Sequence, residues 1–272
     1  MLLRFWGVRG STPTPQRENA DFGGNTPCLE LRTAKGNLFI FDCGTGFRML
    51  GRALQREYGK RGIHARIFLT HYHWDHIQGI PFFTPLYHAR NRFLFHSYRF
   101  EDQSLQRALE GQMTDPYFPV DMTSMGAQRH FFEIGEERMQ YDDLTLISKR
   151  LHHPQGCLGY RIECDGKVVV YATDNEPGNP AGDRKVRELA DGADVLIYDA
   201  QFLPEEMRHH RRWGHSTWKE GVRIAKECKV GQLILFHHDP DRSDPQVRRL
   251  LRRTQHHFDH VIAAREGLTL KL

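Results

Sequence analysis

Four potential metal ligands fall within six residues of this chain, in the pattern H-x-H-x-D-H. They directly follow the apolar run Ile67–Leu69, which reads as a β-strand. On an extended backbone His71 and His73 point the same way, because alternate side chains share one face. Asp75 and His76 come where the chain turns, so they can face a neighbouring position. Imidazole and carboxylate ligands suit zinc, manganese or iron. The motif therefore predicts two metal ions side by side.

Three further candidate ligands come just after other apolar runs. They are His153 (beside His152) after Leu144–Ile147, Asp174 after Val168–Ala172, and His237 (beside His238) after Leu233–Phe236. In a layered sheet the strand ends gather at one edge, where binding sites form. We therefore expect these side chains to join the first motif.

Short apolar runs recur along the whole chain, and many are β-branched and nearly continuous, as in strands covered on both faces. The runs expected to form strands are Leu2–Val8, Leu29–Leu31, Leu38–Phe41, Ile67–Leu69, Phe93–Phe95, Leu144–Ile147, Val168–Ala172, Val195–Tyr198 and Leu233–Phe236. Helices are expected at Phe47–Tyr58, at Thr217–Lys226 after a capping box, and at Pro245–Phe258. The pattern predicts a layered α/β architecture. No linker or internal repeat is visible, so residues 1–272 are expected to form one domain.

Composition excludes several classes of protein. With 39% hydrophobic and 26% charged residues, intrinsic disorder is not expected. A net charge of +4 is too weak for a nucleic-acid coat protein and is compatible with an anionic substrate. The five cysteines are scattered without a C-x-x-C pair, which argues against a disulfide framework. No apolar run approaches the roughly 18 residues of a membrane helix, and no signal peptide is visible, so we expect a cytoplasmic protein.

The segment 80–135 differs from the rest because it is rich in proline and aromatic residues and has one helical patch, near Ser104–Gly111. We expect an insertion or lid near the active site. The aromatic side chains that could wall a pocket and stack a base are Phe82, Phe83, Tyr117 and Phe118. The alternative is an irregular packed connection with no role at the site.

Short motifs across residues 41–240 accompany the histidine run. They are Phe41-Asp42-Cys43-Gly44-Thr45-Gly46, His153-Pro154, Thr173-Asp174, Gly214-His215-Ser216-Thr217 and Phe236-His237-His238-Asp239-Pro240. Together they resemble the metallo-β-lactamase-fold hydrolases, in particular the branch of ribonuclease Z and the phosphoribosyl cyclic phosphodiesterases. The resemblance implies a four-layered αββα sandwich with the site at the sheet edge. It is less specific for the reaction, because this superfamily hosts many hydrolyses.

The resemblance also implies a ligand set. It assigns His71, His73 and His153 to one ion, Asp75, His76 and His237 to the other, and Asp174 to a bridge between them. Two positions stay open, because His152 competes with His153 and His238 competes with His237. The His-Pro step favours His153, and adjacency to the strand end favours His237. Zinc is the expected metal, with manganese or iron as alternatives.

The Gly-His-Ser-Thr motif points to phosphodiester chemistry. In the ribonuclease Z-like branch its histidine is not a ligand but a proton donor or charge stabiliser near the leaving group, which makes His215 a candidate. An alkoxide leaving group needs a proton, and histidine can supply one near neutral pH. The alternative is a capping role at a helix start. Asp199 stands where the branch often has a carboxylate and could orient His215. His215, Asp75 and Asp199 are the candidate catalytic residues.

The implied reaction is attack on phosphorus by a hydroxide that two metals generate from a shared water. Ribonuclease Z commonly carries a long tRNA-gripping arm, in many members between the third histidine and the bridging aspartate. Here Asp174 comes only 21 positions after His153, and Gly156–Ala172 fills that span as a hairpin. We therefore expect a small anionic or cyclic phosphodiester, similar to a cyclic nucleotide, rather than folded RNA.

Three alternative functions remain open. They are hydrolysis of a thioester, lactone or lactam, RNA processing of the ribonuclease Z type, and metal-loaded sensing without turnover. Basic clusters at 208–212 and 248–253 could track a nucleic-acid backbone, but such runs also form solvated faces. The oligomeric state stays open, a dimer included.

Overall fold

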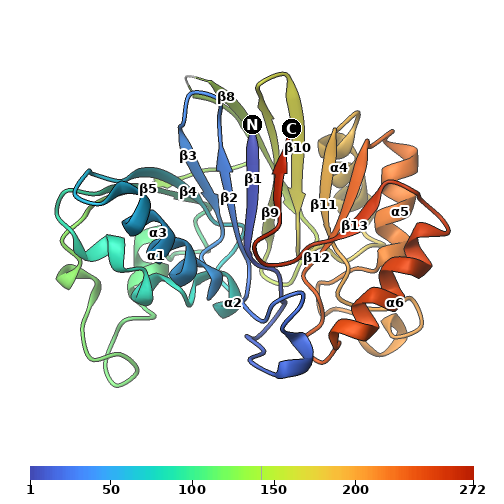
Figure 1. Ribbon diagram of the computed structural model, residues 1–272, viewed down its shortest axis with the longest axis horizontal. Helices are drawn as coiled ribbons and strands as arrows, with labels where there is room; N and C mark the ends of the chain where they lie inside the picture. Colours follow the sequence, from blue (N-terminus) through green and yellow to red (C-terminus); the bar gives the residue numbers. More distant parts are fainter. Residues whose placement is uncertain (142) are drawn as a thin grey trace.

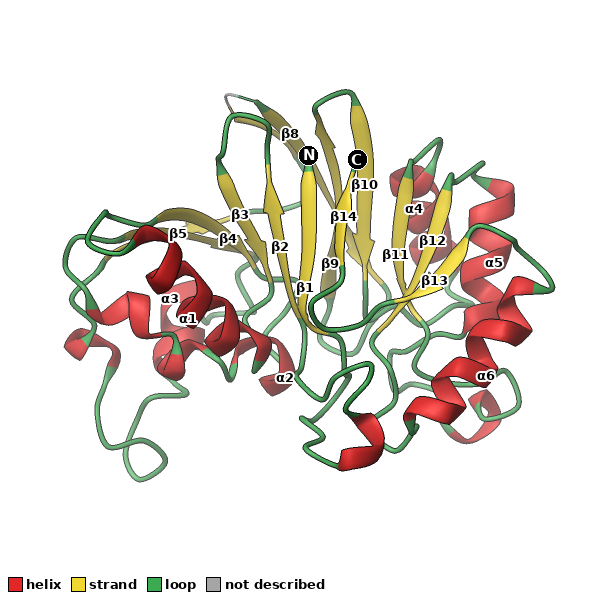
Figure 2. Cartoon of the chain, in the orientation of Figure 1, coloured by secondary structure: helices red, strands yellow, loops and turns green. Residues whose placement is uncertain are grey.

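Two seven-stranded β-sheets pack face to face, and helices cover both outer faces (Figures 1 and 2). The computed structural model describes residues 1–141 and 143–272. In spatial order the first sheet contains β14 (Thr269–Lys271), β1 (Leu2–Gly7), β2 (Cys28–Arg32), β3 (Leu38–Phe41), β4 (His64–Phe68), β5 (Arg92–Ser97) and β6 (Gln128–Glu133). The second contains β13 (Val261–Ala263), β12 (Gln232–Phe236), β11 (Val195–Asp199), β10 (Lys167–Ala172), β9 (Cys157–Cys164), β8 (Leu144–Leu151) and β7 (Arg138–Tyr141).

Both sheets follow the same sequence of strand pairings. In the first sheet the pairs from β14 to β3 are antiparallel and those from β3 to β6 are parallel. In the second sheet the pairs from β7 to β10 are antiparallel and those from β10 to β13 are parallel. One topology therefore occurs twice, although the sequence shows no repeat. Parallel strands in each sheet end at a common edge, where polar loops can meet.

The helices form the two outer layers of the sandwich. They are α1 (Gly46–Tyr58), α2 (Trp74–Ile77), α3 (Leu105–Glu110), α4 (Pro180–Ala190), α5 (Trp218–Glu227) and α6 (Asp244–Gln255), with short 3-10 turns η1 (Arg17–Asn19), η2 (Ile80–Phe82), η3 (Thr84–Tyr87), η4 (Met122–Ser124) and η5 (Met207–His209). The first sheet packs against α1 and α3, and the second against α4, α5 and α6. Among the described residues no helix is long and apolar enough to cross a membrane.

Alternating strand residues divide the apolar side chains between three buried layers. In β4, Phe68 faces the other sheet, whereas Ile67 faces the helices of its own side. In β11, Ile197 lies between the sheets and Tyr198 lies under α5. Both faces of these strands are buried, which explains their nearly continuous apolar sequences. The four-layered αββα sandwich predicted from the resemblance is confirmed. All five cysteines are buried and free.

Every run expected to form a strand overlaps one, and the three expected helices match α1, α5 and α6. Thr217 caps α5 by accepting from the backbone N–H of Glu220. Helix α4 was also not expected from the sequence, and four missed strands have identifiable causes. Strands β6 and β7 are half exposed and rich in polar residues, so they lack an apolar run. Strands β13 and β14 have three residues each, which is too short for a recognisable period.

The segment 80–135 is not wholly an insertion, because β5 and β6 inside it belong to the first sheet. The main parts outside the sheet are residues 80–91, which carry η2 and η3, and the connection 98–127, which carries α3. The prediction that Phe83 walls a pocket is wrong. Phe83 is fully buried and stacks on Phe47 with ring centroids 3.7 Å apart, so it belongs to the core under α1.

Candidate metal centre

The loop after β4 has the local shape that its sequence predicted. His71 and His73 lie on the chain that leaves the strand, and His73 has extended backbone angles as the residue before α2. Asp75 and His76 lie within the short helix α2, where the chain has turned. The two pairs of side chains therefore point at neighbouring positions. Both members of the second pair are buried, as is His71.

The first ligand group consists of His71, His73 and His153, whose ring nitrogens lie within 4.8 Å of one another. His153 Nε2 is 3.1 Å from His73 Nδ1. The Nε2 atom of His71 is buried and has no hydrogen-bond partner among the described residues. Burial lowers the pKa of His71 well below its usual value and that of His153 to about 4. Neutral imidazoles with an unsatisfied nitrogen are the form that binds a metal ion.

The second ligand group consists of Asp75, His76 and His237. His237 Nε2 lies 3.2 Å from Asp75 Oδ2 and 3.3 Å from His76 Nε2. All three side chains are at least nine-tenths buried. Buried polar atoms that lie this close together are expected where they coordinate a cation.

Asp174 lies between the two groups and faces both. Its Oδ2 is 3.3 Å from His76 Nε2 and 3.4 Å from His237 Nε2. Its Oδ1 is 3.8 Å from His71 Nε2 and 3.9 Å from His153 Nε2. Burial alone would raise the pKa of Asp174, but the adjoining histidines lower it well below its usual range. One carboxylate oxygen toward each group is the geometry of a bridging ligand.

The donor set fits divalent transition-metal ions. It contains imidazoles and carboxylates, and no cysteine joins the clusters among the described residues. That set suits zinc, manganese or iron. The buried, unpartnered nitrogen of His71 is independent support, because such an atom is costly unless something fills the centre.

At both open ligand positions the geometry distinguishes the two neighbouring histidines. His152 is exposed, and its Nδ1 lies 2.9 Å from the carbonyl oxygen of Glu176, away from the centre. His238 is buried, but its Nε2 lies 2.8 Å from the carbonyl oxygen of Ala264. The structure brings His153 and His237 into the centre instead.

The second ring nitrogen of each candidate ligand has a partner of its own. In the loop after β4, His71 Nδ1 is 3.0 Å from Thr70 Oγ1, His73 Nε2 is 3.0 Å from Gln155 Oε1, and His76 Nδ1 is 2.8 Å from Asp42 Oδ2. In the second sheet, His153 Nδ1 is 2.8 Å from the Gly214 carbonyl oxygen, and His237 Nδ1 is 2.9 Å from Gln201 Oε1. Such partners fix the orientation and tautomer of a ligating histidine. The nitrogen that faces the centre is therefore Nδ1 in His73 and Nε2 in the other four.

Asp42 is an important residue whose role the sequence reasoning missed. It is fully buried after β3, and it accepts hydrogen bonds from the backbone N–H of Thr70 at 2.8 Å and from the Tyr171 hydroxyl at 2.9 Å, besides its contact with His76. It thus links the first sheet, the histidine loop and the second sheet. In the sequence, Asp42 is marked only by its place in the motif that begins at Phe41, which contributes to the family resemblance.

His215 and Asp199 form a pair beside the centre. His215 Nδ1 lies 2.9 Å from Asp199 Oδ2, and Asp199 Oδ1 accepts from the backbone N–H groups of Ser216 and Gln201, each at 3.0 Å. Burial would lower the pKa of His215, but Asp199, with Asp174 nearby, raises it to about 9. Asp174, Asp199, His215 and His237 also lie within 4.8 Å of one another, so a ligand role is the competing assignment for His215.

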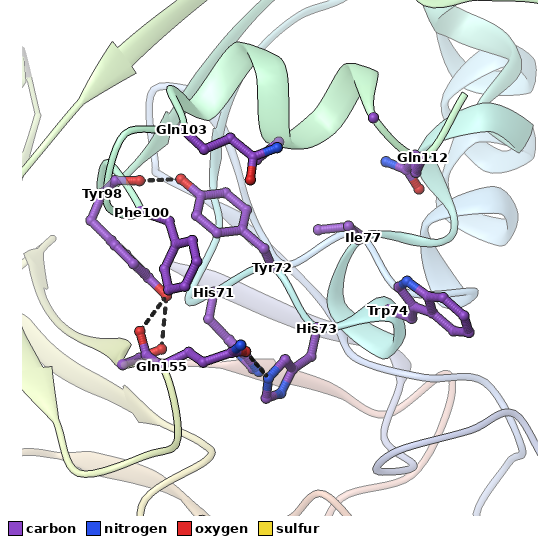
Figure 3. Close-up of a pocket in the computed structure, with 13 residues that line it drawn as sticks. His71, Tyr72, His73, Trp74, Ile77, Tyr98, Phe100, Gln103, Gln112 and Gln155 are labelled. Atoms are coloured by element: carbon purple, nitrogen blue, oxygen red, sulfur yellow. Dashed lines mark hydrogen bonds between the residues drawn. The ribbon is translucent and has the colours of Figure 1, made fainter. Parts of the chain in front are cut away.

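A hollow of about 410 Å³, here called the mouth hollow, opens over the centre. It is lined by Ser11, Tyr72, His73, Trp74, Asp75, Asp174 and His215. A second hollow of about 300 Å³, the side hollow, shares Tyr72, His73 and Trp74 with it (Figure 3). Neither is lined by the four aromatic residues predicted for that purpose, because Phe83 is core and Phe82 packs edge to face on Phe118.

Known proteins resemble the chain over most of its length. The family model described as a Beta-lactamase superfamily domain matches residues 37–238. Ribonuclease Z of Streptococcus suis is 25% identical over an alignment of 322 residues that covers 96% of each chain. A diphosphatase structure from the PhnP family has a TM-score of 0.72 at 21% identity, covering 100% of this chain and 97% of that one. The short form of human tRNase Z has a TM-score of 0.68 at 20% identity, covering 100% and 99%. These structural likenesses establish the fold.

Proposed function

We propose that this chain, which belongs to the β-lactamase superfamily, is a metal-dependent hydrolase of phosphodiesters whose substrate is small or cyclic. The first ligand group with Asp174 would hold one divalent ion, and the second group with Asp174 the other. When bound, such ions lower the pKa of water toward neutrality and offset the negative charge of phosphoryl oxygens. Zinc is the metal we favour for a centre of histidines and carboxylates.

The chain's own residues prepare the centre in two ways. Partners such as Asp42 and Gln201 hold the ring nitrogens of His76 and His237 in fixed directions. The mouth hollow brings the phosphoryl group of a substrate against these ligands while one side stays open to solvent. A preorganised centre of this kind lowers the barrier because its groups do not reorient during the reaction.

The observation that carries the proposal is the pair formed by His215 and Asp199. Asp199 accepts from Nδ1 of His215, so the proton available to a substrate is the one on Nε2. The ring of His215 lines the mouth hollow beside Asp174, where an ester bond would be cleaved. A departing alkoxide would take that proton. A thiolate departs from a thioester without such a donor, because a thiol is far more acidic than an alcohol. The donor therefore favours an ester with an alkoxide leaving group, such as a phosphodiester.

The hairpin of β9 and β10 supports the choice of a small substrate. It fills the chain between His153 and Asp174 completely, with a turn at Asp165-Gly166, and leaves no residues for an arm that grips RNA. The ribonuclease Z relatives favour RNA processing as the second candidate. An exposed basic face on α6 fits that candidate, although Arg248 and Arg253 are paired with Asp21 and Glu205.

The test compares ester classes with one zinc-loaded preparation. We expect turnover of bis-p-nitrophenyl phosphate and of 2′,3′-cyclic nucleotides, and none of a thioester or a lactam. The same preparation is incubated with precursor tRNA. Site-specific trimming of that RNA would move the assignment to RNA processing. Turnover of the thioester alone would replace the phosphodiester proposal with acyl hydrolysis.

A further inference from the structure

The side hollow lies next to the metal centre and has four large aromatic side chains in its lining. It is bounded by the loop after β4, by the connection that carries α3, and by the turn before β9 (Figure 3). Its aromatic walls are Tyr72, Trp74, Tyr98 and Phe100. Trp74 is 79% exposed, which is unusual for so large an apolar side chain. These side chains make the apolar part of the lining.

Amide side chains supply the polar part of the side hollow. Gln103 and Gln112 lie across the hollow from His73, and Gln155 lies beside it (Figure 3). The Nε2 atom of Gln112 is buried and has no hydrogen-bond partner among the described residues. The two tyrosine hydroxyls are already engaged, because Tyr72 donates to the Tyr98 carbonyl and Tyr98 donates to the Gly156 carbonyl at 2.8 Å. Because Gln155 Oε1 is already paired with His73 Nε2, the amides of Gln103 and Gln112 are the ones left to recognise a ligand.

The charge of the side hollow limits its occupant. None of the described residues that line it is Asp, Glu, Lys or Arg. A phosphate would find no lysine or arginine there, and an ammonium group would find no carboxylate. The hollow fits an uncharged, flat group with hydrogen-bonding edges. Its volume of about 300 Å³ is at the small end of ligand sites, which span about 300–1,000 Å³.

The side hollow adjoins the mouth hollow, with which it shares three lining residues. Tyr72, His73 and Trp74 line both. A substrate whose phosphoryl group sits against the metal ligands can therefore extend past Trp74 into the side hollow without leaving the surface of the protein. The two hollows together fit one molecule with a charged end and a flat neutral end.

We propose that the side hollow binds the nucleobase of a nucleotide ester, with Gln112 as a specificity-determining residue. This inference rests on the proposed function, because the base belongs to the ester whose phosphoryl group lies at the metal centre. The aromatic faces stack on the base, as aromatic side chains do with bases of any sequence. The unpartnered amide of Gln112 gains an acceptor on the edge of the base.

The first experiment measures binding to the zinc-loaded protein by calorimetry. AMP and UMP are compared with ribose 5-phosphate, which carries the same phosphate and sugar but no base. We expect at least one of the two nucleotides to have a Kd at least about tenfold lower than that of ribose 5-phosphate. Gln112→Leu should reduce that ratio severalfold and leave metal content unchanged. It deletes a buried donor that has no partner, so the fold should tolerate it.

The matched control is Gln106→Leu. Gln106 lies on α3, is exposed and donates to Glu110 Oε1 at 2.8 Å, outside the side hollow. This variant should keep the wild-type ratio. Equal binding of AMP, UMP and ribose 5-phosphate by the wild type would overturn the base subsite, as would an unchanged ratio in Gln112→Leu.

Kinetics separate this inference from the function on which it rests. Methyl p-nitrophenyl phosphate and thymidine 5′-(p-nitrophenyl phosphate) have the same leaving group and differ in the nucleoside. We expect a lower KM for the thymidine ester, and a rise in that KM, with kcat retained, in Gln112→Leu. If both esters are hydrolysed with equal KM, the base subsite is wrong and the phosphodiesterase stands. If neither ester is hydrolysed while the base still strengthens binding, the phosphodiesterase is wrong and the subsite stands.

Discussion

The two sheets repeat one topology, yet they supply the metal centre in different ways. The first sheet delivers four candidate ligands from one short segment after β4, residues 71–76, whose second half lies in α2. The second sheet delivers His153, Asp174 and His237 from three separate strand ends, with His215 from the start of α5. Ligands on one loop share a local conformation, whereas ligands on separate strands are positioned by the packing of the whole sheet. The first arrangement can be recognised in the sequence, and the second depends on the fold.

The largest effect is expected at Asp174, the residue of the second sheet that faces both ligand groups. Asp174→Ala should reduce the metal content from about two ions per chain to one or none and reduce phosphodiester turnover to background, because each carboxylate oxygen faces a different group. Elemental analysis of purified protein measures this directly. Two ions retained in the variant would refute the bridging role.

A neighbouring pair tests the scattered ligands of the second sheet. His153→Ala removes a nitrogen that lies 3.1 Å from His73 and should cost one ion per chain with most of the turnover. His152→Ala changes an exposed side chain that points away from the centre, so it should keep both metals and wild-type rates. If the two variants behave alike, or in the reverse order, the ligand assignment after β8 is wrong.

His215 separates chemistry from metal binding. His215→Ala should keep both ions and lose about 10²–10⁴-fold in turnover of an ester with an alkoxide leaving group. The loss should be smaller for a nitrophenyl ester, because nitrophenolate leaves without a proton. Metal content and the two rates are measured on one preparation. Release of an ion by this variant would make His215 a ligand, as its closeness to Asp174 and His237 allows.

The smallest effects are expected at the residues that orient the ligands. One such residue after each sheet's strands, Asp42 or Gln201, allows the two sheets to be compared directly. Asp42→Asn removes the charge beside His76 and should weaken metal affinity by about 10–100-fold. Gln201→Leu removes the neutral partner of His237 and should have the weaker effect, about tenfold. Competition with a metal-binding dye measures both. A larger loss in Gln201→Leu would reverse our ranking of the two halves.

The parts of the site that could be predicted from sequence are those encoded locally. H-x-H-x-D-H needs only the geometry of a strand followed by a turn, and His153, Asp174 and His237 each follow an apolar run. The choice of His153 over His152 has a tertiary cause, because the Gly214 carbonyl from a distant loop holds its ring. No local pattern could reveal that contact.

The walls of the side hollow were not predicted because sequence shows which residues are aromatic but not which are buried. Phe83 is apolar and near the motif, yet it is part of the core under α1. Tyr98 and Phe100 come directly after β5, and their position at the site follows from the parallel pairing of β4 with β5. The half-exposed strands β6 and β7 were missed for a related reason, because edge strands carry polar residues that hide their period.

Three residues at the centre have left-handed backbone conformations at the ends of their strands. Asp42, Asp174 and His237 have φ values of 60°, 53° and 59°. Such a conformation costs about 1–3 kcal/mol for a residue other than glycine. A chain selected only for thermal stability would therefore accumulate glycine at these positions and lose its ligands. Consensus or stability-guided redesign of this fold should accordingly hold these three positions fixed, because the substitutions that such methods favour there would yield a hardier but inert protein.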